Sequence, residues 1–476
     1  MPSDPRAAFR PLALLCWSLA AALQCAAQAP PPAAAQPKSL EQLREEYAVR
    51  FFEPEAHMAL ARYFRDAGRP LMAFNLLEAA RRGRFEKEVF DKAFKTYFLG
   101  EKPFDNSAEA EKRLLAQLAQ APDSPELLFG LADIYISREE YAQARTYLDK
   151  LIAREPDDFQ NVRALAQVYE REGKEAEAAR VVREWASAHP GTADSYRARI
   201  ADLSEKEPDK AKALLTEAAA KFPSDGSFPF YLAGIYLHEG NLKEAERLYL
   251  KAAELAPDSS EVQAWVGRFF FKAKPDDRRA LEYYLRAYLL DPDAYETEYV
   301  ESRIPQLAGR LADAHLRELL KGGAPLTSVV EDPDPYVVLA ALEEMEKAWG
   351  PAYTQTLVKL MAHDDGGVRW KATEILQAKA DASFDPTLKE LLRDKDLRRR
   401  GLAAYIAVHR WKAASFEQMR QMLREEAQLL RFDAVSALFI DGGPEGRRIA
   451  FEHAAREPHP WLKKLIEKAK EQPPPE

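Results

Sequence analysis

Cysteine is nearly absent from this chain of 476 residues, which contains only two. Cys16 and Cys25 both lie in a short apolar run, residues 12–29, so the chain that follows contains none. That part can form no disulfide, no cysteine-ligated metal site and no thiolate nucleophile. It must therefore be held together by packing alone.

A basic excess and glycosylation sites are missing as well. Lys and Arg number 68 against 77 Asp and Glu, a net charge of −9, whereas nucleic-acid binders usually carry a basic excess. None of the four asparagines begins an N-x-S/T sequon. Because alanine and arginine are abundant and asparagine is rare, the composition favours a bacterial periplasm over a eukaryotic lumen.

The N-terminus has the pattern of a secretory signal, residues 1–29. Arg6 and Arg10 precede the apolar run, which ends in small residues that would allow cleavage after Ala27 or Ala29. The run is short for a bilayer span, which needs about 20 apolar residues, although an uncleaved anchor stays an alternative. Residues 30–38 are rich in proline and alanine and read as a linker. We expect an exported protein, periplasmic or otherwise envelope-associated, with no integral membrane span in the mature chain.

Prolines recur at a nearly fixed spacing through the next part of the chain. Six of them are separated by 34, 34, 33, 34 and 35 residues: Pro122, Pro156, Pro190, Pro223, Pro257 and Pro292. A period near 34 is typical of a helical array. Within one period, apolar and small residues mark one face of a first helix (Leu128, Leu131, Ala132, Tyr135) and of a second (Ala144, Leu148, Leu151). In sister units the turn between the helices carries Gly173 and Gly240, which tolerate a left-handed backbone.

This pattern resembles the tetratricopeptide repeat family. The family's spacing is met by Leu232, Ala233, Tyr236, Gly240, Ala245, Tyr249, Ala252 and Pro257, by Leu165, Ala166, Tyr169, Gly173, Ala178 and Pro190, and by Leu60, Ala61, Phe64, Gly68, Ala73, Leu77 and Ala80. The resemblance implies about seven units within residues 39–292. Two units depart from it: residues 88–122 lack a clear first helix, and residues 193–223 place Arg197 where a large apolar residue is expected.

A second period of about 30 residues follows a stretch, 293–324, in which we expect transition helices. Three columns align: Val337, Val368, Leu397 and Leu430; Ala341, Ala372, Gly401 and Ala434; Met345, Leu376, Tyr405 and Leu438. With Arg369, Arg398 and Arg431 these columns resemble HEAT repeats, although Val338 takes the place of the arginine in the first unit. Residues 325–470 are expected to form this array. The fold class is therefore all-α, a solenoid of stacked antiparallel helix pairs in which a tetratricopeptide superhelix precedes HEAT-like repeats.

The sequence offers no catalytic constellation, and we expect a non-enzymatic protein without cofactor or metal. The sequence His363-Asp364-Asp365 could suggest a metal site, but it precedes a helix where aspartate is favoured as an N-cap. The glycine-rich stretch 441–446 lacks the lysine and Ser/Thr of a phosphate loop, and no G-x-S-x-G occurs. Arg398 to Arg400 leave two hypotheses: a solvated helix with one structural arginine, or a site for an anionic partner helped by Arg393 and Arg410.

The tetratricopeptide resemblance implies that first-helix residues away from the packing positions line a concave groove. These candidate partner-binding residues are Phe129, Asp133 and Ser137, Arg163, Gln167 and Glu170, Phe230 and His238, and Arg268 and Lys272. Exposed aromatic residues among charges suit peptide recognition, in which a few anchors provide most of the binding energy.

Two functional hypotheses follow. In the first, the chain is a non-enzymatic envelope scaffold that binds a protein or peptide partner in this groove, with the HEAT-like half as a second surface. In the second, it is a structural accessory of an envelope assembly or polysaccharide-export complex, which it contacts through the HEAT-like half. Neither hypothesis involves nucleic acid.

Overall fold

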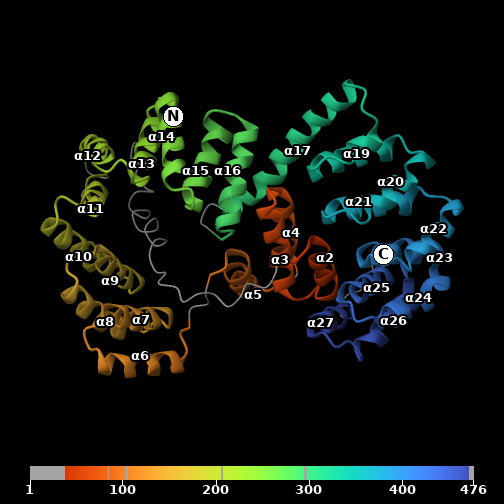
Figure 1. Ribbon diagram of the computed structural model, residues 1–476, viewed down its shortest axis with the longest axis horizontal. Helices are drawn as coiled ribbons and strands as arrows, with labels where there is room; N and C mark the ends of the chain where they lie inside the picture. The colour runs from red at the N-terminus through yellow and green to blue at the C-terminus, as the bar shows by residue number, and fades with distance from the viewer. Residues whose placement is uncertain (1–37, 84, 102–104, 205–206, 294–296, 471–476) are drawn as a thin grey trace. The chain divides into compact units, whose positions relative to one another are not determined.

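The computed structural model describes residues 38–83, 85–101, 105–204, 207–293 and 297–470 (Figure 1). The signal segment predicted for residues 1–29 and all but the last residue of the predicted linker lie outside these ranges. Within them the secondary structure is entirely helical, which confirms the predicted all-α class. No helix in the described part of the chain is long and apolar enough to cross a membrane. The contacts divide the chain into two compact units, of which unit 1 contains Pro103–Glu296 and unit 2 contains Pro31–Lys102 and Thr297–Glu476.

Unit 1 consists, among its described residues, of one single helix followed by five helix pairs. The single helix is α6 (Ala108–Gln120), and the pairs are α7 (Pro125–Ser137) and α8 (Tyr141–Arg154), α9 (Phe159–Arg171) and α10 (Glu175–Ala188), α11 (Ala193–Ser204) and α12 (Pro208–Lys221), α13 (Ser227–His238) and α14 (Leu242–Leu255), and α15 (Ser260–Arg268), extended by a π-helical turn (Phe269–Ala273), with α16 (Asp277–Leu290). In Figure 1, α7 and α9 lie on the inside of the curve of this unit, whereas α8 and α10 lie on its outside.

The predicted packing register is the observed one in unit 1. Residues of the two helix faces in the first pair are all buried and form one cluster with Leu165 and Val168 of α9. Ala132 and Ala144 are fully enclosed, as small side chains must be where two helices cross at close distance. Gly173 and Gly240 adopt positive φ angles of 73° and 77° in the turns. In the pair α7–α8 the corresponding turn residue is Glu139, with a φ angle of 61°. This left-handed conformation is unfavourable for any residue other than glycine.

The two atypical repeats behave differently. The helices of the repeat expected over residues 88–122 are assigned to different units: α5 (Lys87–Ala93) and its π-helical extension Phe94–Leu99 belong to unit 2, and α6 belongs to unit 1. The pair over 193–223 is formed by α11 and α12. There Arg197 is tolerated because its guanidinium bonds Asp194 at 2.7 Å, pairs with Asp225 and lies 5.6 Å from the centre of the Phe228 ring.

Unit 2 combines N-terminal helices with the HEAT-like part. The N-terminal helices are α2 (Leu40–Val49), α3 (Pro54–Asp66), α4 (Pro70–Gly83) and α5. The later helices are α17 (Thr297–Lys321), α18 (Leu326–Val329), α19 (Pro335–Lys347), α20 (Thr354–Leu360), α21 (Gly366–Lys379), α22 (Asp385–Leu391), α23 (Leu397–Trp411), α24 (Phe416–Met422), α25 (Gln428–Asp441), α26 (Gly443–Ala454) and α27 (Pro460–Ala469). Short 3-10 turns precede α20, α22 and α24. The stretch expected to hold transition helices is thus occupied mainly by the single 25-residue helix α17.

The HEAT-like columns are buried as predicted, except that Leu397 is only half-buried. Gly401 takes the small position in α23, and a Cβ atom there would fall 2.0 Å from a carboxylate oxygen of Asp433, so even alanine is too large. The arginines of two repeats hold the turn that precedes their own helix. Nη1 of Arg369 donates to the carbonyls of His363 and Asp364, and Nη1 of Arg431 to those of Glu425 and Glu426.

The turn conformation leads to a stability prediction. We expect Glu139→Gly to raise the free energy of unfolding by about 0.5–1 kcal/mol, because relief of the left-handed strain outweighs the added freedom of the unfolded chain. Gly173→Ala, at the equivalent turn, should lower it by about 1 kcal/mol. Both values can be measured by urea unfolding. A Glu139→Gly midpoint at or below that of the wild type would contradict the strain argument.

Candidate functional site

The candidate residues predicted from the sequence all lie in unit 1, on or at the end of the first helices of its pairs. We call the side chains that α7, α9, α11, α13 and α15 direct away from the helix packing the first-helix face. Phe129 of α7 is exposed on it, with 45% of its surface accessible. His238, Glu170, Ser137 and Lys272 are exposed too, whereas Asp133, Gln167 and Arg268 are half-buried. Most of the predicted residues therefore remain accessible.

Phe230 is a correction to the prediction. Its side chain is only 5% exposed and packs against the rings of Tyr231 and Tyr249, with centroid distances of 5.4 and 6.0 Å. Its position in the repeat alone suggested an exposed aromatic residue. The sequence around it, however, is apolar on every side, so α13 is buried nearly all round and Phe230 belongs to the core.

Four polar residues on α7 and α9 share an unusual property. Asp133, Arg163, Gln167 and Glu170 make no side-chain hydrogen bond or ion pair with any described residue, although Arg163 is only 8% exposed. By contrast, Arg138 lies 2.5 Å from Glu111, and Arg197 bonds Asp194 at 2.7 Å and pairs with Asp225. The four residues therefore have unused hydrogen-bonding capacity.

The pKa shifts of three of these four residues also indicate unused hydrogen-bonding capacity. Burial raises the pKa of Asp133, with Arg171 opposing the shift, and burial together with Glu175 raises the pKa of Glu170. Burial lowers the pKa of the Arg163 guanidinium; Asp194 opposes this shift and Arg197 adds to it. Asp133 and Arg163 have lost part of their water without gaining a sufficient partner, which disfavours their charged forms, whereas Glu170 remains exposed. Such groups are candidates for contact with a ligand.

Unit 2 contains a second notable region, where its N-terminal helices dock on the HEAT-like part. The second helices of successive HEAT-like pairs, α19, α21, α23 and α25, form a row, and α2 packs against α23 and α25 of that row. Phe51 and Phe52 lie between α2 and α3. Their ring centroids are 5.3 and 6.0 Å from that of Phe432 in α25, and the Phe52 centroid is 4.8 Å from that of Trp461. The backbone N–H of Phe52 donates to Oε1 of Gln428 at 2.7 Å. The row is thus covered in part by helices of the same chain.

Asp364 is the charged centre of this docking. Its carboxylate, 8% exposed, accepts from Arg44 of α2 at 2.6 Å, from Arg69 at 3.3 Å and from Arg398 of α23 at 3.4 Å. Burial alone would raise the pKa of Asp364, but the three guanidinium groups lower it below its usual range. The next residue, Asp365, caps α21 by accepting from the backbone N–H of Val368, as the sequence predicted for this turn.

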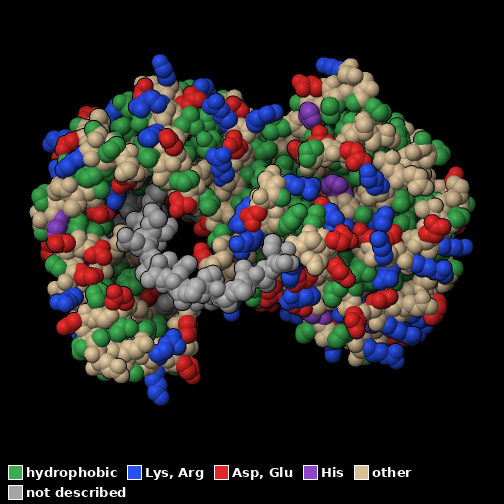
Figure 2. Space-filling view, in the orientation of Figure 1, with side chains coloured by type: hydrophobic (Ala, Val, Ile, Leu, Met, Phe, Trp, Pro, Cys, Tyr) green, Lys and Arg blue, Asp and Glu red, His purple; other side chains and the backbone are tan. Residues whose placement is uncertain are grey.

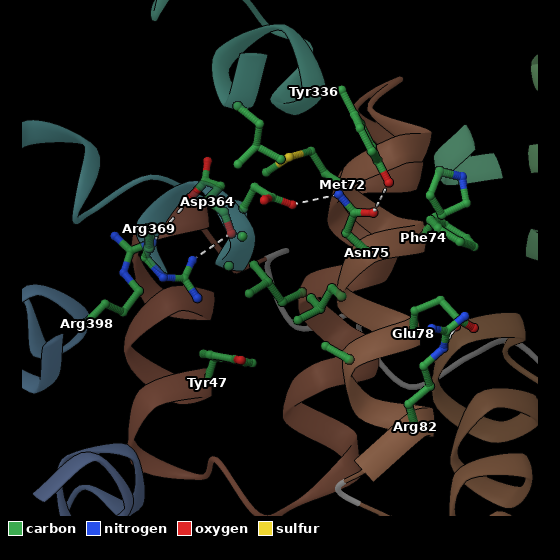
Figure 3. Close-up of a pocket in the computed structure, with 18 of the residues that line it drawn as sticks. Tyr47, Met72, Phe74, Asn75, Glu78, Arg82, Tyr336, Asp364, Arg369 and Arg398 are labelled. Carbon is green, nitrogen blue, oxygen red and sulfur yellow. Dashed lines mark hydrogen bonds and ion pairs between the residues drawn. The ribbon is translucent and has the colours of Figure 1, made fainter. Parts of the chain in front are cut away.

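A cavity of about 400 Å³ lies beside these contacts (Figure 3). Its walls come from α2–α4, α17, α19, the start of α21 and α23. The lining combines apolar side chains with two groups of charged ones, Asp364 with Arg369 and Arg398, and Glu78 with Arg82. Asn75 of α4 bridges two of the lining residues, because its Nδ2 donates to Asp365 at 2.8 Å and its Oδ1 accepts from the hydroxyl of Tyr336 at 3.2 Å. Sequence periodicity contained no signal for this site, because its residues come from repeats far apart in the chain.

The three arginines at residues 398–400 pair with carboxylates of the protein itself. Arg398 is buried and pairs with Asp396 and Asp364, Arg399 lies 3.1 Å from Asp394, and Arg400 lies 3.6 Å from Glu425. Each arginine therefore has a carboxylate within the same unit, which favours the first of the two hypotheses for this run. On the faces visible in Figure 2, acidic and basic side chains are interspersed over both units.

Comparison with known families agrees with the two repeat patterns. Residues 105–168 and 202–268 match the tetratricopeptide repeat family, and residues 323–408 match HEAT repeats. The first two ranges lie in unit 1 and the third in unit 2. The chain therefore contains stretches that match tetratricopeptide repeats and a stretch that matches HEAT repeats.

Similarity to individual proteins is partial. The human protein O-mannosyl-transferase TMTC1 is 30% identical over 207 residues, which are 42% of this chain; the match spans 23% of that protein. Among solved structures, MamA from Desulfovibrio magneticus RS-1 is 20% identical over 36% of this chain and 97% of its own, with a TM-score of 0.26. The human IFIT1 dimer with PPP-AAAA is 16% identical over 83% of this chain and 86% of its own, with a TM-score of 0.29. TM-scores this low do not show that the complete folds are similar.

The three-arginine contact predicts a large effect of a single substitution. Asp364→Asn should lower the free energy of unfolding of unit 2 by about 3 kcal/mol, because it removes a largely buried carboxylate that pairs with three guanidinium groups, among them the buried Arg398. It should also increase the rate of hydrogen exchange in Leu40–Val49, which Arg44 ties to Asp364. Glu445→Gln, which breaks the exposed pair with Arg448, is the control and should change stability by less than about 1 kcal/mol. Equal effects of the two substitutions would refute this role of Asp364.

His363 predicts a pH dependence in the same region. Burial lowers its pKa from the ordinary value of 6.5, Asp365 and Asp364 oppose the shift, and Arg369 and Arg69 add to it. The stabilisation by neutral His363 is therefore complete above about pH 6.5 and is lost as the pH falls through the lowered folded pKa. Unfolding midpoints measured from pH 8 to pH 5 should decline more steeply for the wild type than for His363→Gln, which cannot be protonated. Parallel profiles would exclude His363 as the cause.

Proposed function

We propose that this chain is a non-enzymatic protein–protein interaction scaffold that binds a protein or peptide partner along the first-helix face of unit 1. The observation that carries the proposal is the set of unpaired polar side chains Asp133, Arg163, Gln167 and Glu170. An unpaired, largely buried guanidinium costs free energy in the isolated protein, and a ligand that supplies the missing partner recovers it.

The proposed contact combines an apolar anchor with charge recognition. Phe129 is exposed on the same helix as Asp133, and Arg163 shares α9 with Gln167 and Glu170. A partner segment with one apolar side chain and both signs of charge would suit this surface. Binding energy at such interfaces is concentrated in a few aromatic and arginine residues, so Phe129 and Arg163 are the expected anchors.

The setting that we propose is the bacterial envelope. The support is the N-terminal signal pattern in residues 1–29 and the absence of cysteine from the chain that follows it. Fractionation and N-terminal sequencing of the expressed chain test this part of the proposal. A chain that keeps its first 29 residues and stays in the cytoplasm would overturn it.

Partner capture tests the binding face. A photo-crosslinking residue at position 167, on the first-helix face, should capture a partner in the native envelope fraction. The same residue at position 184, on the second helix α10 and 62% exposed in the side chain, should not capture it. Capture from both positions, or only from position 184, would place the interface elsewhere.

The affinity of the captured partner then gives the decisive measurement. Phe129→Ala combined with Arg163→Ala should raise the dissociation constant at least tenfold, since each anchor contributes more than about 1 kcal/mol. Leu242→Ala is the matched control, because Leu242 is also exposed in unit 1 but lies at the start of the second helix α14, and it should leave the constant within about twofold. Phe230 is unsuitable for this test, because its truncation would open the core. Unchanged binding by the double variant would show that the first-helix face is not the recognition surface.

A further inference from the structure

The cavity in unit 2 has the size and lining of a site for a small molecule (Figure 3). Its volume of about 400 Å³ lies in the range of roughly 300–1,000 Å³ that is typical of ligand pockets. Leu60, Met72 and Leu339 are among its apolar lining residues, and several polar and charged side chains complete the lining. None of its residues belongs to the first-helix face, so this site is independent of the function proposed above.

The carboxylates around the cavity already have partners. Asp364 is held by three arginines, and Asp365 accepts from the backbone N–H of Val368 at 3.0 Å and from Nδ2 of Asn75 at 2.8 Å. Glu78 of α4 accepts from Nε of Arg82 at 2.7 Å. No carboxylate among the described lining residues is thus left to attract a cationic ligand.

Donors remain available in the lining. Arg369 uses Nη1 for the carbonyls of His363 and Asp364, at 2.7 and 2.8 Å, while its Nε and Nη2 bond no described residue. The hydroxyl of Tyr47 has no hydrogen-bond partner among the described residues, although its ring is packed by Phe51 and His57. Burial lowers the pKa of the Arg369 guanidinium, with Tyr47 as the main opposing group and Arg398 adding to the shift. The cavity therefore presents an incompletely balanced positive charge beside a free hydroxyl.

We propose that this cavity binds a small organic carboxylate with an apolar body. The carboxylate would accept from Nε and Nη2 of Arg369 and from the Tyr47 hydroxyl, because a guanidinium edge suits two carboxylate oxygens. The apolar body would lie against Leu60, Met72 and Leu339. Burial of that body would provide most of the affinity, and the charged end would provide the selectivity for an acid over a neutral analogue.

The probe is 4-phenylbutyrate, with 4-phenylbutanol as its uncharged counterpart. Calorimetric titration of the full chain should give a dissociation constant at least tenfold lower for the acid, since hydrogen bonds to charged groups contribute more than neutral ones. Tyr47→Phe should weaken binding of the acid about fivefold and leave the alcohol unaffected. Tyr97→Phe, at an exposed tyrosine of the same unit that does not line the cavity, should change neither.

Two substitutions that fill the cavity complete the test. Ala79→Trp and Leu339→Trp come from different helices, α4 and α19, at lining positions that are not fully buried, so the fold should tolerate them. Each should abolish binding of the acid while the circular dichroism spectrum stays unchanged. The proposal is overturned if the acid does not bind at millimolar concentration, if the alcohol binds equally well, or if either folded tryptophan variant binds the acid as the wild type does.

Discussion

A helix pair with one apolar face cannot bury that face by itself, and both units of this protein are arranged around that constraint. Each pair in unit 1 covers the next, and stability is approximately a sum of pair and interface terms. The end of an array leaves one face without a neighbour. In unit 1, α6 covers the first pair, because Leu114 and Leu118 pack on its cluster while most other positions of α6 face solvent. Unit 2 meets the same constraint with α2, which packs on the row formed by α23 and α25.

The fold could be predicted wherever a residue's environment repeats along the chain. Ala132, Ala144 and Gly173 are specified by contacts inside a pair or with the next pair, so periodicity reveals them. Periodicity does not reveal contacts between residues that are far apart in the sequence. It assigned the first tetratricopeptide-like repeat to a continuous array, yet that repeat groups with HEAT-like helices through contacts such as Asn75 with Asp365, 290 residues apart. No local pattern encodes such a contact, because it depends on the complementarity of two separate surfaces.

The candidate site was predicted only in part for a related reason. Repeat position predicts which side chains leave the helix packing. Of the residues that it selected, Phe129 is 45% exposed, whereas Arg163 is only 8% exposed. Repeat position does not indicate whether neighbouring residues bury the side chain, as they bury Phe230. Nor does it indicate whether a charged side chain forms an ion pair. Arg197 pairs with Asp194 and Asp225, whereas Arg163, on the first helix of the preceding repeat, makes no ion pair with a described residue. That difference required the three-dimensional arrangement.

The docking of α2–α4 has a consequence for how the chain is made. Contacts such as those of Arg44 with Asp364 and Phe52 with Gln428 join residues 320 and 376 positions apart. Ribosomes add about 5–20 residues per second, so the N-terminal helices wait roughly 15–75 seconds for the surface that covers Phe51 and Phe52. During that time the aromatic pair is exposed on a nascent chain that cannot complete its own core. The order of synthesis therefore makes the first helices of the protein the last to reach their final surroundings.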